Sequence, residues 1–205
     1  MSALKLCSGT VALLSRDNVD TDQICPARFM QRRRAEGYSD AFLHDLRFAA
    51  DGTVRDNPID AVSGASILVA GRNFGGGSSR ESAAYAVVDA GFRVVVASSF
   101  GDIFAANAAR NGLVPALVHA EDLSRLTQHL ELRRDHVVSV DVERLTIHAG
   151  NLSLDFHLDD SRRTMLLNGW DDLDVTLQYG HAIDAFVNKD RAERPWAAVT
   201  GSAPS

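Results

Sequence analysis

The middle of the chain alternates apolar runs of strand length with stretches of helical pattern. Ile67–Ala70 and Val94–Ala97 are apolar at every position, which is typical of strands buried on both faces of a sheet. The predicted helices Ser82–Ala90 and Phe100–Asn111 follow these two runs, and a third run spans Leu113–Val118. This order predicts a parallel sheet joined by right-handed crossovers.

The flanking regions predict further strands and helices around this sheet. After residue 136 apolar and polar residues alternate in three short segments separated by turns, which indicates a series of β-hairpins. We also expect a polar loop over Asp17–Gln23 and a single domain over residues 1–196, followed by a disordered tail, 197–205. The remaining predicted strands are Leu4–Leu14, within which Val11–Leu14 is itself expected to be a strand, Val137–Val142, Leu145–His148 and Leu152–Leu158. The remaining predicted helices are Ser39–Phe48, Glu121–Leu132, Ser161–Asn168 and Asp174–Val187.

Charge and composition argue against several classes of function. The formal net charge of the 205 residues is −6, and Arg32-Arg33-Arg34 is the one strongly basic run, so we expect no nucleic-acid surface. The sequence has neither an apolar run long enough to span a membrane nor a signal-peptide pattern, so we expect no membrane partner and a cytoplasmic location. Without a recognisable export signal, the two cysteines, Cys7 and Cys25, are expected to be free thiols rather than a disulfide.

A glycine-rich turn joins the first apolar run to its helix and carries polar chemistry. Its sequence is Gly75-Gly76-Gly77-Ser78-Ser79-Arg80-Glu81. Such a turn lets a ligand approach the backbone closely, and an arginine at its end can bind a carboxylate through two hydrogen bonds. The spacing fits equally well a simple turn with a serine helix cap and a solvated arginine. The run lacks the Gly-Lys-Ser/Thr ending of a phosphate-binding P-loop.

A second polar motif, Asp20-Thr21-Asp22, lies in the loop near the start of the chain. Alone, the two aspartates fit a turn or a helix cap better than a functional site. Because the glycine-rich motif is also present, we expect a functional role for Asp22.

Together these motifs resemble the small subunits of 3-isopropylmalate dehydratase, which correspond to the swivel domain of the aconitase family. The resemblance runs in order from about Val11 to Trp196. It implies an α/β fold, a swivelling β/β/α domain with a parallel core sheet and additional antiparallel strands. Further segments that carry it are Phe42–Phe48, Ser99–Phe104, Asn111–Pro115 and Arg194–Trp196.

The resemblance implies roles for four residues of the two motifs. Ser78 would act as the base that removes a proton beside a substrate carboxylate, and Arg80 would bind that carboxylate. Ser79 would add a hydrogen bond to the substrate. Asp22 would orient a histidine of the partner subunit, which donates a proton to the leaving hydroxide.

The resemblance also implies a substrate-recognition loop within the basic segment that follows Asp22. A loop arginine there would bind a carboxylate of a small hydroxy-dicarboxylate substrate. We expect this arginine to be Arg34, with Arg32 and Arg33 as the next candidates.

The expected activity is that of a hydro-lyase, isomerising 2-isopropylmalate and 3-isopropylmalate in leucine biosynthesis, and it requires a large subunit. Two cysteines cannot supply the three thiolates that typically hold an iron–sulfur cluster in this superfamily. We therefore expect no metal or cofactor on this chain and a [4Fe–4S] cluster on the large subunit.

Three departures from the family pattern leave alternatives open. The family often has Cys at the position of Gly76 and His at that of Ser82, and many members have Arg-Thr-Gly-Phe-Gly where this chain has Ala35–Ser39. Because the last difference falls in the recognition loop, a small subunit acting on 2-methylmalate or dimethylmalate is one alternative. A non-catalytic module that binds a dicarboxylate or a partner protein is another.

Overall fold

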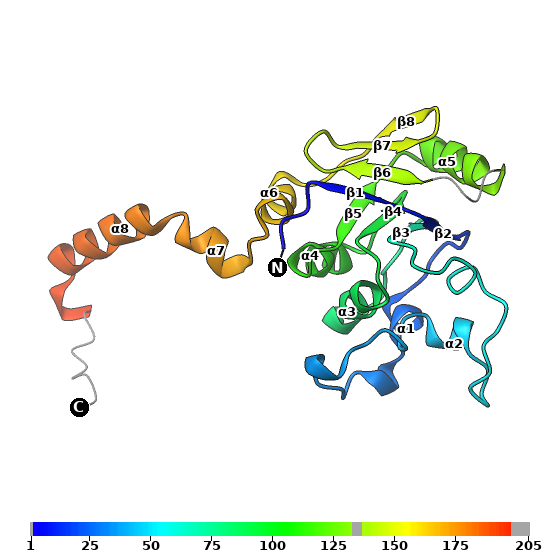
Figure 1. The fold of residues 1–205 in the computed structure, drawn as a ribbon. Helices are drawn as coiled ribbons and strands as arrows, with labels where there is room; N and C mark the ends of the chain where they lie inside the picture. Colours follow the sequence, from blue (N-terminus) through cyan, green and yellow to red (C-terminus); the bar gives the residue numbers. More distant parts are fainter. Residues whose placement is uncertain (1, 133–136, 198–205) are drawn as a thin grey trace. The chain divides into compact units, whose positions relative to one another are not determined.

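A computed structural model describes residues 2–132 and 137–197 of the chain (Figure 1). The chain divides after Trp170 into two compact units, which are described separately. The first unit holds two four-stranded sheets. Its strands are β1 (Leu6–Gly9), β2 (Val11–Leu14), β3 (Ile67–Ala70), β4 (Val94–Ala97), β5 (Val114–Leu117), β6 (Val138–Asp141), β7 (Thr146–Ala149) and β8 (Leu152–Asp155). Its α-helices are α1 (Thr21–Ile24), α2 (His44–Arg47), α3 (Glu81–Asp89), α4 (Asp102–Arg110), α5 (Ala120–Leu132) and α6 (Asp160–Asn168), with short 3-10 turns at Ala27–Phe29 and Arg34–Glu36.

The core of the first unit is a parallel sheet in the order β2-β3-β4-β5. Its strands are buried on both faces. Successive side chains of a strand point to opposite sides of the sheet, and both sides are covered by hydrophobic residues. Along β3, Ile67 and Val69 pack into one hydrophobic cluster, while Leu68 and Ala70 pack into the other. This explains why the strands are apolar at every position, and the predicted parallel core is confirmed.

The two clusters define a β/β/α arrangement. One cluster joins the parallel sheet to the antiparallel sheet β1-β6-β7-β8 through residues such as Val138 and Ile147. The other joins the opposite face to α3 and α4, through Ala83, Val87 and Phe104 (Figure 1). The predicted α/β fold with additional antiparallel strands is therefore confirmed.

Three predictions of local structure were wrong in part. The segment Leu4–Leu14 is not one strand, since Leu6–Gly9 pairs with β6 and Val11–Leu14 pairs with β3; the strand predicted over Val11–Leu14 is confirmed. The predicted polar loop Asp17–Gln23 contains the start of α1. The predicted helix Ser39–Phe48 is helical only over α2, because Leu43 before it adopts a left-handed conformation with φ of 49°.

The second unit contains α7 (Asp172–Leu177), α8 (Gly180–Glu193) and a 3-10 turn at Pro195–Ala197. The single helix predicted over Asp174–Val187 is thus two helices. Neither helix has a buried residue, and Leu173, Leu177 and Phe186 are more than 60% exposed. The prediction of one domain over residues 1–196 stays a prediction, and most of the predicted tail, residues 198–205, lies outside the described residues.

Membrane-spanning helices are absent from the part of the chain that the structure describes: none of its helices is both long enough and apolar enough.

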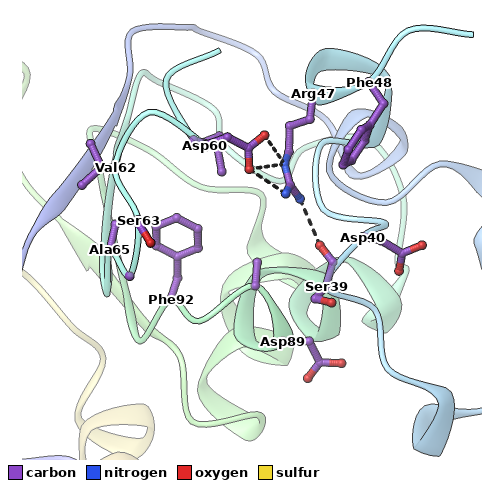
Figure 2. A pocket seen from close by; sticks show the side chains of 13 residues that line it. Ser39, Asp40, Arg47, Phe48, Asp60, Val62, Ser63, Ala65, Asp89 and Phe92 are labelled. Carbon is purple, nitrogen blue, oxygen red and sulfur yellow. Dashed lines mark hydrogen bonds and ion pairs between the residues drawn. The ribbon is translucent and has the colours of Figure 1, made fainter. Parts of the chain in front are cut away.

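Arg47 holds together the irregular connection that follows α2. Its guanidinium donates hydrogen bonds to the Asp60 carboxylate at 2.7 to 3.2 Å and to the Ser39 carbonyl oxygen at 3.0 Å (Figure 2). It also donates to the Phe42 carbonyl oxygen at 3.1 Å. Beside it lies a cavity of about 380 Å³, walled by Asp40, Asp60 and Asp89 among others. No residue expected to act in catalysis lines this cavity, so we assign Arg47 and Asp60 a structural role.

The Asp60 carboxylate is expected to make the free energy of unfolding depend on pH in the acidic range. Hydrogen bonds from Arg47 lower its pKa below the usual value of 3.8. The folded-state pKa lies below that of the unfolded chain, so this stabilisation is fully present above about pH 4 and is lost as the pH falls through the folded-state pKa. In urea unfolding between pH 6 and pH 3, Asp60→Asn is expected to be less stable than the native chain at pH 6 and to lose less stability on acidification. Equal acid dependence of the two proteins would contradict this role.

Candidate active site

Three loops converge at the edge of the parallel sheet where β2, β3 and β4 end. Gly75 N–H donates to the Val19 carbonyl at 2.7 Å, and Thr21 N–H donates to the Gly76 carbonyl at 2.9 Å. On the other side Phe74 N–H donates to the Ser99 carbonyl at 3.0 Å. These bonds continue the parallel pairing beyond the strands. The carboxyl edge of a parallel sheet is where open α/β folds bind ligands.

Two glycines give the central loop its path. Gly75 and Gly77 have φ of 74° and 100°, a region that residues with a Cβ rarely adopt. A Cβ at Gly75 would lie 2.2 Å from Cγ of Phe104, which is fully buried. The loop can therefore lie against α4 only with glycine at this position, and Ser78 follows directly from the turn.

Ser78 meets Thr21 of the first loop. The two hydroxyl oxygens are 2.7 Å apart, and Ser78 N–H donates to the Thr21 hydroxyl at 3.2 Å. Thr21 is 1% exposed, whereas Ser78 is half-buried and Ser79 is exposed. The first hydroxyl of the motif is thus held in place, and the second faces solvent.

Arg80 and Asp22 form an ion pair across the same two loops. The Arg80 side chain is 20% exposed, and that of Asp22 is 58% exposed. Asp20 instead caps α1, accepting a hydrogen bond from Gln23 N–H at 2.8 Å. The helix-cap interpretation therefore holds for Asp20. The structure brings together three of the expected site residues, Asp22, Ser78 and Arg80.

The arginines of the expected recognition loop are bound to carboxylates of this chain. Arg34 donates two hydrogen bonds to Asp89, at 2.6 and 2.8 Å, and its guanidinium lies 4.6 Å from the centre of the Tyr85 ring. Arg32 likewise donates to both oxygens of Asp40, at 2.6 and 2.8 Å, and lowers the pKa of that carboxyl.

Arg33 is the most exposed arginine of this run. Its side chain is 87% exposed and donates to Glu36 at 2.8 Å. Of the three arginines of the expected recognition loop, it is the one most open to solvent.

Arg80 and Arg34 lie at opposite ends of α3. Arg80 precedes the first residue of the helix, and Arg34 binds Asp89, the last. At 1.5 Å per residue the backbone of Arg80 and that of Asp89 are about 13 Å apart. In this conformation Arg34 therefore lies far along α3 from the Ser78 turn.

Other residues of the site carry no sequence prediction. Asp17 accepts hydrogen bonds from Arg72 N–H and its guanidinium, both at 2.9 Å, which lowers the pKa of that carboxyl. Asn73 donates to Asn18 at 3.0 Å, and both have positive φ. These residues fasten the first loop to the second. Pairs 55 residues apart leave no periodic signal, whereas Thr21 could have been recognised as the uncharged residue between the two aspartates of the Asp20-Thr21-Asp22 motif.

Comparisons with known proteins identify the family. The aconitase C-terminal domain family matches residues 1–121. The 3-isopropylmalate dehydratase small subunit of Micrococcus luteus is 42% identical, with 92% of this chain and 90% of the relative covered. That of Shouchella clausii is 38% identical, with 94% and 98% covered. The chain belongs to the family of 3-isopropylmalate dehydratase small subunits. The resemblance expected from the motifs is thereby confirmed.

A solved structure agrees with the small-subunit fold. The 3-isopropylmalate dehydratase (leuD) of Methanocaldococcus jannaschii matches with a TM-score of 0.63 and 24% identity, covering 88% of this chain and 98% of that chain. At this identity the match supports the fold alone.

The close approach of Gly75 to Phe104 predicts that a side chain at position 75 destabilises the fold. Gly75→Ala is expected to lower the free energy of unfolding by about 3 kcal/mol, because a left-handed backbone costs about 1 kcal/mol and the clash with a packed core adds about 2. Gly52→Ala is the matched control, since Gly52 has a similar φ of 83° and no atom within 4 Å of its Cβ position. Urea unfolding should show about 1 kcal/mol for this control. Equal losses in the two variants would mean that Phe104 moves aside.

Proposed function

We propose that this chain is the small subunit of a heteromeric 3-isopropylmalate dehydratase, which interconverts 2-isopropylmalate and 3-isopropylmalate in leucine biosynthesis. Relatives 38 to 42% identical over nearly their whole length support the assignment. The observation that carries it is the convergence of Ser78, Arg80 and Asp22 at the carboxyl edge of the parallel sheet.

Ser78 is the proposed base. Dehydration requires removal of a poorly acidic proton from a carbon beside a carboxylate, and the proton passes to the Ser78 oxygen. A serine hydroxyl is a weak acid, so it acts as a base only where hydrogen bonds and positive charge stabilise its deprotonated form. The half-buried position of Ser78, two residues before Arg80 and in contact with a buried hydroxyl, supports this role.

Arg80 is the proposed ligand of the substrate carboxylate next to the reacting carbon, and the exposed Ser79 adds a hydrogen bond to the substrate. In the free chain Arg80 forms an ion pair with Asp22. On substrate binding we expect Arg80 to exchange Asp22 for the substrate carboxylate. Asp22 is then released to orient a histidine of the large subunit.

The recognition loop supplies a further arginine for the second carboxylate. Arg34 is proposed for this role, with Arg32 and Arg33 as the next candidates. Because Arg34 binds Asp89 at the far end of α3, this role requires the loop to release Asp89 and move towards Ser78. The pairing with Asp89 keeps the guanidinium neutralised until a substrate carboxylate replaces it.

The iron–sulfur cluster is proposed to belong to the large subunit. The two cysteines of this chain are both buried, and burial raises the pKa of both thiols, which disfavours the thiolate that binds metal. In the described residues no group of three or more metal-binding side chains occurs. This chain does not fit the cluster. The two free cysteines also support a cytoplasmic location, where thiols stay reduced.

The first test is the dehydration of 2-isopropylmalate by this chain reconstituted anaerobically with its large subunit. Ser78→Ala is expected to lower kcat by about a thousandfold, within the range for loss of a positioned acid–base group. Arg80→Lys is expected to raise KM and lower kcat/KM by about tenfold or more, because lysine cannot replace the two-point contact with a carboxylate. Arg144→Lys, at an exposed position on the antiparallel sheet hairpin, is the control.

The substrate panel of this experiment separates the alternatives. Turnover of 2-methylmalate or dimethylmalate in place of 2-isopropylmalate would keep the mechanism and move the substrate, with Ala35–Ser39 as the region to examine. Dicarboxylate binding without turnover would favour a non-catalytic module. Turnover by the purified chain alone would contradict the proposed subunit role.

The role of Arg34 has a test of its own. Arg34→Lys is expected to raise KM severalfold, whereas Asp89→Asn should affect KM little or lower it, since it frees Arg34 for the substrate. Both variants lose the two-point hydrogen bonding between Arg34 and Asp89, so each serves as the other's control for stability. Parallel increases in KM in the two variants would show that Arg34 only anchors the loop.

A further inference from the structure

The Thr21 hydroxyl is placed at the oxygen of the proposed base. The Thr21 and Ser78 hydroxyl oxygens are 2.7 Å apart, a distance typical of an O–H···O hydrogen bond. Thr21 is 1% exposed, and its own N–H is fixed by the Gly76 carbonyl at 2.9 Å. Water therefore has little access to this hydroxyl, and its backbone is held from the same loop that carries Ser78.

The direction of the hydrogen bond follows from the neighbouring groups. The Thr21 oxygen already accepts the Ser78 N–H at 3.2 Å. A deprotonated Ser78 oxygen has no proton to donate, so in that state only the Thr21 O–H can donate across the 2.7 Å contact. The same threonine thus fixes the Ser78 backbone through one lone pair and meets the Ser78 oxygen with its proton.

We propose that Thr21 is a positioning residue, which orients the Ser78 hydroxyl and stabilises its deprotonated form by donating a hydrogen bond. The inference rests on the proposed function for the identity of Ser78 as the base. Thr21 acts through Ser78, since its side chain is buried and contacts the Ser78 hydroxyl and N–H. It explains why a buried threonine lies between two exposed or half-exposed aspartates in the Asp20-Thr21-Asp22 motif.

The charged groups around this pair have other partners that substitution of Thr21 leaves in place. Asp20 accepts the Gln23 N–H, and Asp22 pairs with Arg80. Glu81, at the start of α3, accepts a hydrogen bond from Asn111 at 3.1 Å. A change in proton affinity at position 78 on removal of the Thr21 hydroxyl therefore reports on the hydroxyl rather than on these charges.

The first experiment needs no enzymatic activity. Ser78→Cys places a thiol at the position of the base in the full chain, and its pKa is measured from the pH dependence of alkylation, followed by mass spectrometry of the peptide. Adding Thr21→Val removes the hydroxyl at nearly constant shape and is expected to raise that pKa by about one unit, a tenfold change in proton affinity. Adding Thr21→Ser instead keeps the hydroxyl and should restore the lower pKa.

The second experiment uses the reconstituted enzyme. Thr21→Val is expected to shift the acid side of the pH profile of kcat upward by about one unit, with little change in KM, while Thr21→Ser should retain the native profile. Because valine also leaves Ser78 N–H without its acceptor, circular dichroism checks the fold of each variant, and the serine variant remains informative if the valine variant unfolds.

The outcomes separate this inference from the proposed function. An unchanged thiol pKa in the folded Thr21→Val chain, or a Thr21→Ser chain whose thiol pKa is raised as much as by valine, overturns the role of Thr21. A raised thiol pKa together with an unmodified enzyme that does not turn over 2-isopropylmalate supports the role of Thr21 and overturns the proposed substrate.

Discussion

The site depends on backbone hydrogen bonds that continue the β2–β3 pairing beyond the ends of the two strands. The bonds Gly75 N–H to Val19 and Thr21 N–H to Gly76 join segments more than 50 residues apart without using a side chain. They fix the Ser78 turn relative to α1 independently of any charged side chain. The ion pair of Arg80 with Asp22 and the hydroxyl contact of Ser78 with Thr21 both follow from this alignment.

The arginines expected to bind substrate are all neutralised by carboxylates of the chain itself. Asp22 binds Arg80, and Asp40, Glu36 and Asp89 bind Arg32, Arg33 and Arg34 in turn. On the proposed function, a dicarboxylate substrate would replace existing ion pairs instead of approaching bare cations. Each exchange would substitute one charge-assisted pair for another, so the net gain on binding would be small compared with the strength of either pair. Such exchange would favour ligands that present two carboxylates at the required separation.

The sequence predicted the parts of the fold that depend on local pattern. The strands from Ile67 to Leu117 could be predicted because burial on both faces requires a continuous apolar run, and the helices between them because each follows such a run with a helical pattern. Ser8, Gly9 and Thr10 interrupt the apolar pattern of Leu4–Leu14, and the strand predicted over Val11–Leu14 is confirmed as β2. The pairing of Leu6–Gly9 with a different sheet could not be predicted, because an interruption in the pattern does not say which strand each side pairs with.

The same limit applies to the site. The two motifs were predicted to act together, and the ion pair of Asp22 with Arg80 brings them together. The pairing of Arg34 with Asp89 was not predictable, because it joins a loop to a helix 55 residues later. Charge pairing at that separation leaves no periodic trace.

The departures at Gly76 and Ser82 can be understood from how the site is built. The contribution of Gly76 is its carbonyl oxygen, which accepts the Thr21 N–H and is present whatever the side chain. A Cβ at Gly76 would lie 2.8 Å from the Asn73 side-chain oxygen, the end of a side chain on the exposed rim of the loop. Cysteine or glycine at this position therefore changes how Asn73 packs and leaves the Thr21–Ser78 contact in place. Ser82 follows Arg80 within the first turn of α3, where its side chain is not part of that contact. Variation at these two positions is compatible with the proposed mechanism, because the backbone, rather than their side chains, aligns Ser78.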